Sequence, residues 1–411
     1  MNKLIVHPGH FNSSFFQNEV KYLKKYFDEV VLISYNEKDE DELFSFCNSN
    51  NIQYHMVGKN NLIYLFNRIF IKWLFSDIVK NEIKKNIDFD KHFIFKLLYV
   101  IYYGIFYIKT KEYIDNEIEK SDVDNIIIYA YWLSRPAFTA AMHNDNSKVN
   151  KVISRAHGYD LYTMRNKLNY LPFRNFIDAN LDEIHFISEH GLEYFKENFT
   201  KTTKDKNKSK KYISRLGTYN NIKVNKKIKK KDYICIASCS YIRKVKRLDL
   251  IIDVIANIEY KVKWIHIGDG KLMDEIKIYA KKMLDAKDYI FLGEVKNSRI
   301  LDIYKEYDVD YFINMSESEG VPVSIMEAIS FGLPIIARNV GGNSEIVTKN
   351  GLLIDSMEDK EEVFNIINSF VSKRVNNLNA YLNQSQNSLN LWNEKYHADI
   401  NYESFFKNLL K

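Results

Sequence analysis

The C-terminal half of the chain alternates short apolar runs with longer amphipathic stretches, and this alternation limits the fold more than any other feature. Residues 233–239 and 262–268 have the length of strands, and each precedes a stretch with apolar residues at helical spacing. The same order recurs after YIFLG, VDYFIN, LPIIA and GLLI. Strands separated by helices run parallel, because each helix carries the chain back along the sheet. The pattern therefore predicts an α/β fold with a parallel, doubly wound sheet.

The N-terminal half shows a similar but less regular alternation. Apolar strands are predicted at residues 3–6, 29–35, 125–132, 151–154 and 183–188. The lysine-rich run 223–231 has no apolar period and precedes a new strand, so it predicts a domain boundary. We therefore expect an N-terminal domain at 1–222, a C-terminal domain at 223–390 and a helical tail at 391–411.

Composition and charge exclude several classes of protein. With 411 residues and 46% hydrophobic residues, the chain can form two or three globular cores. Three cysteines are too few for a disulfide framework, and the N-terminus enters a strand without an apolar signal segment, which predicts a cytoplasmic protein. No uninterrupted apolar run reaches the roughly 18 residues of a membrane-spanning helix. The net charge of +6 is modest for this length, and no nucleic acid partner is predicted.

Two carboxylates separated by seven residues, Glu319 and Glu327, form the centre of the candidate site. An apolar strand is predicted just before Glu319, and the helix predicted at 323–329 carries Glu327 about one turn in. Carboxylates repel phosphate but bind hydroxyl groups. Since the same segment can also bind an anion, a sugar nucleotide is the expected ligand.

The anion site is predicted in the turn between that strand and that helix. Gly320 lets the backbone approach a ligand closely, and the N–H groups of Val321 and Val323 point out of the helix start towards an anion. Pro322 suits the first helical turn, which needs no N–H from it. A phosphate is therefore expected to dock at this turn.

The stretch SESEGVPVSIMEAISFGLPIIA resembles the retaining glycosyltransferases of family four. In that family two Glu residues are separated by seven others and are followed by Gly, Pro and Ala, here Gly332, Pro334 and Ala337. The resemblance implies the GT-B fold, in which two Rossmann-like domains face a central cleft and a C-terminal helix crosses back onto the first domain. It also implies that Glu319 contacts the donor sugar and that Glu327 binds the ribose of the nucleotide.

Further donor-binding residues follow from the same resemblance. Lys246 lies where the family keeps a Lys that binds the diphosphate. Many members carry an Arg five residues earlier, whereas this chain has Tyr241 there, so Arg243 or Arg247 is expected to supply the missing charge. Arg243 is favoured because it lies in the loop between strand and helix. Two more contacts to the nucleotide are implied at Gly268 and Leu292.

Residues near the acceptor or donor sugar are expected in the N-terminal half. The family carries a His that reaches the donor sugar at the place of His157, and Arg155 and Asp160 are weaker candidates for acceptor or phosphate contact. Gly9 and His10 occupy a loop that lines the cleft in the family, although an ordinary turn explains Gly9 equally well.

Residues 61–113 are unusually aromatic and predict helices with broad apolar faces, interrupted by Arg68, Lys72 and Lys96. Two interpretations remain open. The helices cover the N-terminal sheet, or one face lies in a membrane interface, where Tyr, Trp and Lys are favoured. The lysine runs 201–211 and 223–231 are solvated surface or would hold the protein on anionic lipid.

Other chemistries fit the sequence less well. The pairs Asp122-Val-Asp124 and Asp308-Val-Asp310 resemble cation ligands, but their apolar neighbours indicate strand starts, so no metal and no other cofactor is predicted. Gly268-Asp-Gly270 lacks the third glycine of a dinucleotide fingerprint, which argues against a dehydrogenase. A catalytically silent nucleotide-sugar-binding protein, an epimerase and a phosphorylase stay as alternatives.

Together with these residues, the resemblance implies a retaining, metal-independent glycosyltransferase. Its expected donor is a UDP-sugar in preference to a GDP-sugar, and its expected acceptor is a hydroxyl of a lipid-linked or saccharide molecule. The resemblance favours a role in capsule, O-antigen or other surface glycan synthesis. A cytoplasmic location, with peripheral attachment to the inner face of the membrane as a variant, completes the hypothesis.

Overall fold

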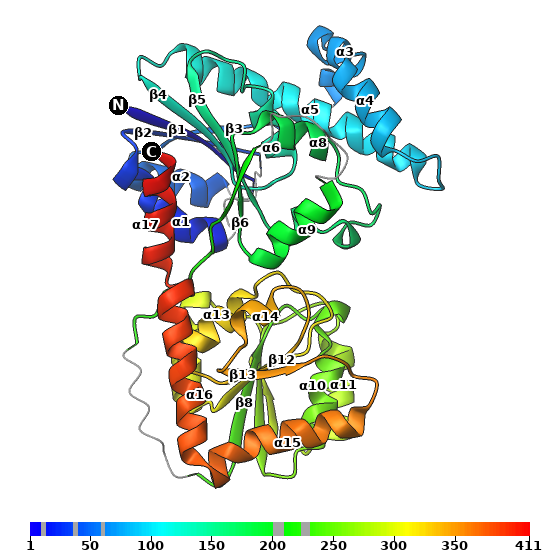
Figure 1. The fold of residues 1–411 in the computed structure, drawn as a ribbon, viewed down its shortest axis with the longest axis vertical. Coiled ribbons are helices and arrows are strands. Elements are labelled where there is room, and N and C mark those ends of the chain that lie inside the picture. The colour runs from blue at the N-terminus through cyan, green and yellow to red at the C-terminus, as the bar shows by residue number, and fades with distance from the viewer. Residues whose placement is uncertain (10–13, 36–39, 59–61, 200–208, 223–230) are drawn as a thin grey trace. The chain divides into compact units, whose positions relative to one another are not determined.

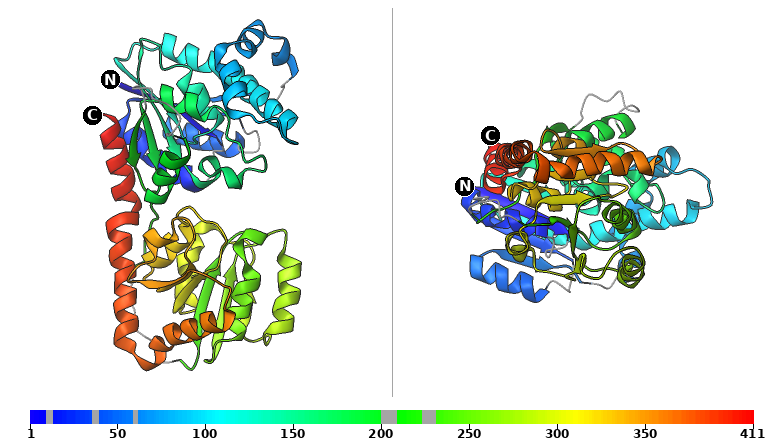
Figure 2. Two further views of the ribbon diagram at one scale, coloured as in Figure 1. Left: turned by 45° about the vertical axis from the view of Figure 1, so that its right-hand side comes forward. Right: turned by 90° about the horizontal axis from the view of Figure 1, so that it is seen from below.

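The computed structural model describes residues 1–9, 14–35, 40–58, 62–199, 209–222 and 231–411. They form two compact units, Met1–Ser214 with Tyr402–Lys411 (unit 1) and Arg215–Asn401 (unit 2). The units divide a few residues before the expected boundary at 222/223, and the part of the tail that belongs to unit 1 begins at Tyr402. Each unit is a parallel sheet with helices packed against its faces (Figures 1 and 2).

Unit 1 contains a sheet whose described strands run in the order β3-β2-β1-β4-β5-β6-β7, with every pairing parallel. The strands are β1 (Asn2–Gly9), β2 (Glu29–Ser34), β3 (Gln53–Met56), β4 (Asn125–Ala130), β5 (Val149–Ala156), β6 (Glu183–Phe186) and β7 (Lys210–Ile213). Helices cover both faces of a parallel sheet, so its central strands are continuous apolar runs. The strand β4, with the sequence NIIIYA, is such a run and is almost entirely buried. The strand order reverses between β1 and β4, and ligands of such sheets bind beyond the carboxyl ends at this switch point.

The described helices between residues 14 and 199 pack around this sheet, except those at residues 68–86, which extend away from it (Figure 1). They are α1 (Ser14–Tyr26), α2 (Glu40–Asn50), α3 (Arg68–Leu74), α4 (Asp77–Asn86), α5 (Phe93–Glu119), α6 (Arg135–Ala141), α7 (Gly158–Leu161), α8 (Arg174–Asn180) and α9 (Glu189–Phe199). By length and composition α5 is the one helix of the described residues that could cross a membrane. Core helices pass the same test, and 56% of its most apolar window is buried. Val100, Tyr103 and Tyr107 share the helix face that packs into the core of unit 1.

Unit 2 repeats the architecture. Its described strands run in the order β10-β9-β8-β11-β12-β13, again with parallel pairings. They are β8 (Ile234–Cys239), β9 (Val262–Ile267), β10 (Tyr289–Phe291), β11 (Tyr311–Asn314), β12 (Ile335–Arg338) and β13 (Gly351–Ile354). The helices are α10 (Leu248–Ala256), α11 (Met273–Met283), α12 (Ile300–Glu306), α13 (Val323–Ser330), α14 (Asn343–Ile346), α15 (Lys360–Asn376) and α16 (Leu378–Leu391). The predicted parallel, Rossmann-like architecture of both halves is confirmed.

The end of the chain packs against the start. After a π-helical turn at Trp392–Tyr396, α17 (Ala398–Leu409) places Phe405 and Phe406 against aromatic side chains of unit 1. Glu403 of α17 forms an ion pair with Lys25 of α1. The last residues of the chain therefore complete the core of unit 1 rather than a core of their own.

Candidate active site

The switch point of unit 2 brings Lys246 and Glu319 together. β8 and β11 are neighbours, and the strand order reverses between them, so the loops after their carboxyl ends meet. Lys246 ends a 3₁₀ turn that follows β8, and Glu319 lies in the loop between β11 and α13. Lys246 Nζ donates a hydrogen bond to Glu319 Oε1 at 2.6 Å, and Asn314 Nδ2 approaches the same oxygen at 3.3 Å. The site therefore pairs a cation with a nearly buried carboxylate.

The loop that carries Glu319 is held in place by neighbouring backbone. Gly342 N donates to Gly320 O at 2.8 Å. Gly341 has a φ of 54°, and a Cβ there would lie 1.9 Å from the carbonyl oxygen of Glu319. Only glycine therefore permits this packing. The remaining residues predicted at the turn follow in order: Val321 is buried, Pro322 stands at the N-cap one position before the helix, and Val323 is the first residue of α13.

Glu327 lies one helical turn into α13 and is buried. Burial raises the pKa of its carboxyl from an ordinary 4.5 to about 7, although a hydrogen bond from the Asn297 side-chain amide opposes the rise. A carboxyl with this pKa is partly protonated near neutral pH. It can therefore exchange between accepting and donating hydrogen bonds to hydroxyl groups.

Loops after the three adjacent strands β8, β9 and β10 pack closely on one another at the same edge of the sheet. Gly268, after β9, has a φ of 133°, and a Cβ there would lie 2.0 Å from Ser240 O in the loop after β8. Gly268 N donates to Gly293 O at 2.8 Å, and Leu292 N donates to His266 O at 2.9 Å. Gly268 and Leu292, both predicted at the nucleotide, thus lie in loops at the carboxyl edge of the sheet.

The two arginines considered as replacement cations differ in their surroundings. Arg247 Nη1 lies 2.9 Å from Glu317 Oε1, and Arg247 Nη2 lies 2.8 Å from Asp249 Oδ2. The bonds to Asp249 and then Glu317 raise the pKa of its guanidinium. Arg243 is exposed, and its guanidinium lies over the ring of Tyr241, 4.7 Å from the ring centroid.

A second polar group lies at the carboxyl ends of β4 and β5 in unit 1. The imidazole of His157 packs against Trp132 with ring centroids 4.4 Å apart, and burial, then the charge of Arg155, hold its pKa well below the usual value. Asp160 accepts hydrogen bonds from the backbone N–H groups of His157 and Leu133, both at 2.6 Å. Asp160 therefore fixes the loop that carries a neutral His157.

Gly9, at the end of β1, packs against the same loop. Its φ is 75°, and a Cβ would lie 2.7 Å from Trp132 Cδ1, so a side chain there would displace the indole. Trp132 Nε1 donates to Pro8 O at 3.0 Å. Gly9 and His157 are thus both in contact with Trp132. His10 lies outside the described residues.

Arg155 is placed differently from the other candidates. Its side chain is fully buried in unit 1, forms an ion pair with Glu19 of α1, and lies over the ring of Phe405. Asp310, from the second Asp-x-Asp pair, is likewise occupied, with Lys231 Nζ 2.7 Å and Arg374 Nε 2.8 Å away. Both environments favour structural roles.

Several residues of these sites were missed by sequence reasoning. Asn297 bonds Glu327 from a loop thirty positions earlier, and Arg174 donates to Leu133 O and Asp160 O, both at 2.5 Å. Neither carries a motif. Gly341 and Gly342 had a usable signal, because two consecutive glycines after an apolar strand indicate close backbone packing.

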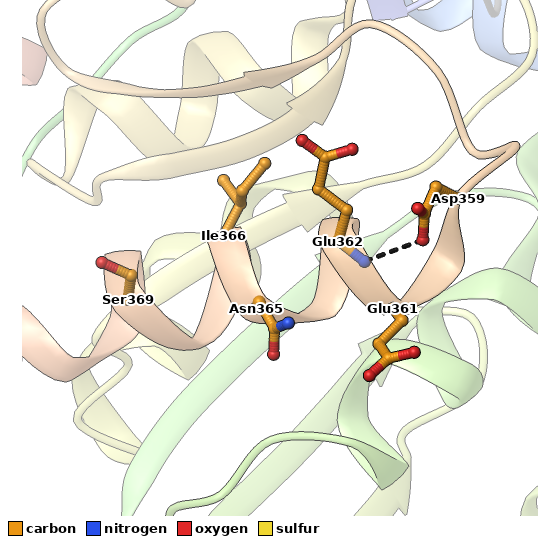
Figure 3. A pocket seen from close by; sticks show the side chains of 6 residues that line it. All are labelled: Asp359, Glu361, Glu362, Asn365, Ile366 and Ser369. Atoms are coloured by element: carbon orange, nitrogen blue, oxygen red, sulfur yellow. Dashed lines mark hydrogen bonds between the residues drawn. The ribbon is translucent and has the colours of Figure 1, made fainter.

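A surface hollow on α15 contains none of the predicted residues (Figure 3). It is lined by Asp359, Glu361, Glu362, Asn365, Ile366 and Ser369. Asp359 Oδ1 accepts from Glu362 N at 3.0 Å, which is an ordinary helix cap. The hollow therefore adds nothing to the candidate site.

Sequence comparison relates this chain to glycosyltransferases. Residues 220–388 match the family described as glycosyl transferases group 1. The O-antigen biosynthesis glycosyltransferase WbnH of Escherichia coli is 34% identical over 116 residues, which are 28% of this chain and 31% of WbnH. An Escherichia coli UDP-Gal:alpha-D-GlcNAc-diphosphoundecaprenol alpha-1,3-galactosyltransferase is 35% identical over 111 residues, 26% of each chain. These curated relatives are thus matched over about a third of their length or less.

A solved structure extends the likeness to the whole chain. The crystal structure of Anabaena Alr3699/HepE in complex with UDP has a TM-score of 0.67 and 12% identity, covering 100% of this chain and 99% of that chain. This likeness confirms the expected GT-B fold. The residues that match the group 1 family, 220–388, lie within unit 2.

Proposed function

We propose that the protein is a retaining, metal-independent glycosyltransferase of family four. It transfers a sugar from a nucleotide-sugar, preferentially a UDP-sugar, to a hydroxyl of a lipid-linked or saccharide acceptor. The observation that carries this proposal is the contact between Lys246 and Glu319 at the switch point of the group 1 domain. Lys246 can bind the diphosphate, and Glu319 beside it can bind sugar hydroxyls, so the pair suits a sugar nucleotide. HepE with bound UDP and a relative named for UDP-Gal support the choice of nucleotide.

In the proposed reaction, the bond between the donor anomeric carbon and the diphosphate oxygen breaks, while the acceptor oxygen attacks from the same face. The acceptor proton passes to the departing phosphate. Lys246 and the amides after Gly320 offset the charge that develops on the nucleoside diphosphate. Glu319 orients the donor sugar, Glu327 binds ribose hydroxyls, and the neutral His157 hydrogen-bonds the donor sugar. No metal is needed, because these groups already supply the electrostatic stabilisation.

The proposed setting is the synthesis of a capsule, O-antigen or other surface glycan by a cytoplasmic protein attached peripherally to the membrane. The role of WbnH in O-antigen biosynthesis and the diphosphoundecaprenol-linked substrate of the related galactosyltransferase support this setting.

Incubation with radiolabelled sugar nucleotides and a lipid extract tests the proposal. Transfer of label to lipid or saccharide supports the proposal. The rates in EDTA and in magnesium should be equal. The NMR coupling constant of the anomeric proton in the first product should show the same configuration as in the donor. Binding without turnover would indicate a silent homologue. Isomerised or phosphorolysed sugar would indicate an epimerase or a phosphorylase.

A further inference from the structure

Exposed apolar side chains are concentrated on one part of unit 1. Seven large apolar residues between positions 66 and 98 are each more than half exposed, from 51% for Ile69 to 89% for Phe89. We call these seven residues the apolar ridge: Phe66, Ile69, Phe75, Phe89, Ile94, Phe95 and Leu98. They lie in α3 and just before and after it, in the turn between α4 and α5, and in the first turns of α5, a region that projects from the sheet of unit 1 (Figures 1 and 2).

The opposite side of these helices packs into the core of unit 1. Trp73 of α3 packs so closely on Gly104 of α5 that a Cβ at Gly104 would lie 2.0 Å from the indole. Phe70, Val79 and Val100 are buried in the same core. The helices therefore have one apolar face that packs and another that faces solvent. Exposed apolar patches of this kind mark interaction surfaces.

The same segment carries an excess of exposed positive charge. Its exposed basic residues are Arg68, Lys72, Lys80, Lys84, Lys85 and Lys91. Its exposed acidic residues are Asp77, Asp88 and Asp90, and Asp90 is paired with Lys96 at 2.9 Å. Apolar and aromatic side chains combined with lysines are typical of surfaces that lie in the interface of an anionic bilayer.

A cationic side chain, that of Arg135, lies near the end of the apolar ridge on α5. Tyr102 follows Leu98 by one helical turn and is 41% exposed. The guanidinium of Arg135, at the start of α6, lies 4.3 Å from the Tyr102 ring centroid and 4.9 Å from that of Phe106. Within the described part of the chain, no carboxylate forms an ion pair with Arg135. Its planar N–H groups are therefore available to bind a phosphate bidentately.

We propose that the apolar ridge lies in an anionic bilayer and that Arg135, at its edge, holds a lipid phosphate. This inference rests on the proposed function and specifies its acceptor as a saccharide joined to a membrane lipid through phosphate. The lysines attract the surface to the headgroups, the ridge enters the interface, and the phosphate of the acceptor lipid meets the guanidinium that stacks on Tyr102.

Vesicle flotation of the full chain tests the ridge. We expect the protein to float at low salt with vesicles that contain phosphatidylglycerol, and to float poorly with phosphatidylcholine alone. Phe89→Ser with Phe95→Ser should lower partition about tenfold. Ile278→Ser, which removes a 72% exposed side chain from α11 of unit 2, is the matched control and should change nothing. No flotation, or equal flotation of the double variant, would overturn the proposal. A dimer that the double variant dissociates, without flotation, would overturn it in favour of self-association.

Neutral vesicles doped with a polyprenyl phosphate test Arg135 separately from bulk anionic lipid. The unmodified chain should float with these vesicles, Arg135→Gln should lower partition about tenfold, and Arg135→Lys should fall between them. Equal partition of Arg135→Gln and the unmodified chain would remove the phosphate role. Since neither assay measures sugar transfer, failure of this inference is distinguishable from failure of the proposed function.

Discussion

The Nζ of Lys246 lies 2.6 Å from the Oε1 of Glu319, so the cation proposed to hold the donor diphosphate is itself held by the carboxylate proposed to contact the donor sugar. The Glu319 side chain is only 8% exposed, and that of Lys246 is 25% exposed. A diphosphate that arrives at this site must therefore compete with Glu319 for the ammonium group.

This competition predicts opposite effects of one substitution on binding and on turnover. Glu319→Gln should tighten UDP binding by about fivefold, because the Lys246 ammonium is released, which corresponds to ~1 kcal/mol for a partly exposed pair. The turnover number should fall, because the sugar loses its orienting carboxylate. Calorimetry and steady-state kinetics measure the two effects. Glu317→Gln, which changes the exposed partner of Arg247, is the control; weaker UDP binding by Glu319→Gln would contradict the competition.

The raised pKa of Glu327 predicts a pH dependence of nucleotide binding. Below about 7 the carboxyl is largely protonated, so it accepts ribose hydroxyls poorly. UDP affinity should therefore increase as the pH rises through this value. Glu327→Gln should bind UDP more weakly and keep only the titration of the nucleotide itself. Calorimetry over a pH series measures this, and an unchanged profile in Glu327→Gln would assign the titration to another group.

The same carboxyl should make the folded protein less stable at higher pH. Its pKa is about 7 when folded against an ordinary 4.5, so between these values the folded state binds more protons than the unfolded chain, and the stability contributed by this group falls as the pH rises. Glu327→Gln should remove this loss and raise the free energy of unfolding by about 2 kcal/mol above neutral pH, with little effect near pH 5. Denaturant unfolding at both pH values provides the comparison, and equal gains at both would exclude the carboxyl as the cause.

Sequence patterns predicted those parts of the structure that are determined by residues close together in the sequence. The strand before Glu319 and the helix that carries Glu327 follow from apolar periodicity, and their mutual placement follows from the rule for strand switch points. Arg155 shows the limit of such reasoning. It follows an apolar strand like a ligand-binding residue, but its burial depends on Glu19 and Phe405, which lie far away in the sequence. Asn297 could not be predicted for the same reason.

The packing of Gly341 against the Glu319 loop predicts a strong effect of a single methyl group. Gly341→Ala would place a Cβ 1.9 Å from Glu319 O and also strain a φ of 54°. The loop must move, so we expect a loss of about 3 kcal/mol in transition-state stabilisation or in stability. Gly58→Ala, where no atom lies within 4 Å of the added Cβ, is the control. Unchanged kcat/KM and unfolding midpoint in Gly341→Ala would contradict the packing argument.

The buried pair of Arg155 and Glu19 predicts a structural phenotype. Arg155→Met leaves the Glu19 carboxyl buried without its cation and should lower the free energy of unfolding by about 3 kcal/mol. Adding Glu19→Leu should restore part of this loss, because an apolar pair needs no compensation. Denaturant midpoints of the three proteins test the prediction. A stable Arg155→Met with a raised acceptor KM would instead support the acceptor contact expected from the sequence.

The last prediction concerns the charge that Tyr241 does not supply. Arg247 is held by Asp249 and Glu317, so its guanidinium is already neutralised. Arg243 is exposed and stacks on Tyr241, and among the described residues no carboxylate pairs with it, so it can turn towards a diphosphate bound near Lys246. Arg243→Ala should therefore cost about 2 kcal/mol in kcat/KM, the usual loss for one charged donor to a developing phosphate charge, and Arg247→Ala should cost less. Steady-state kinetics on both variants and on Lys246→Ala decide the matter. If Lys246→Ala is inactive while Arg243→Ala turns over like the unmodified enzyme, Lys246 acts alone and Arg243 is a solvated side chain.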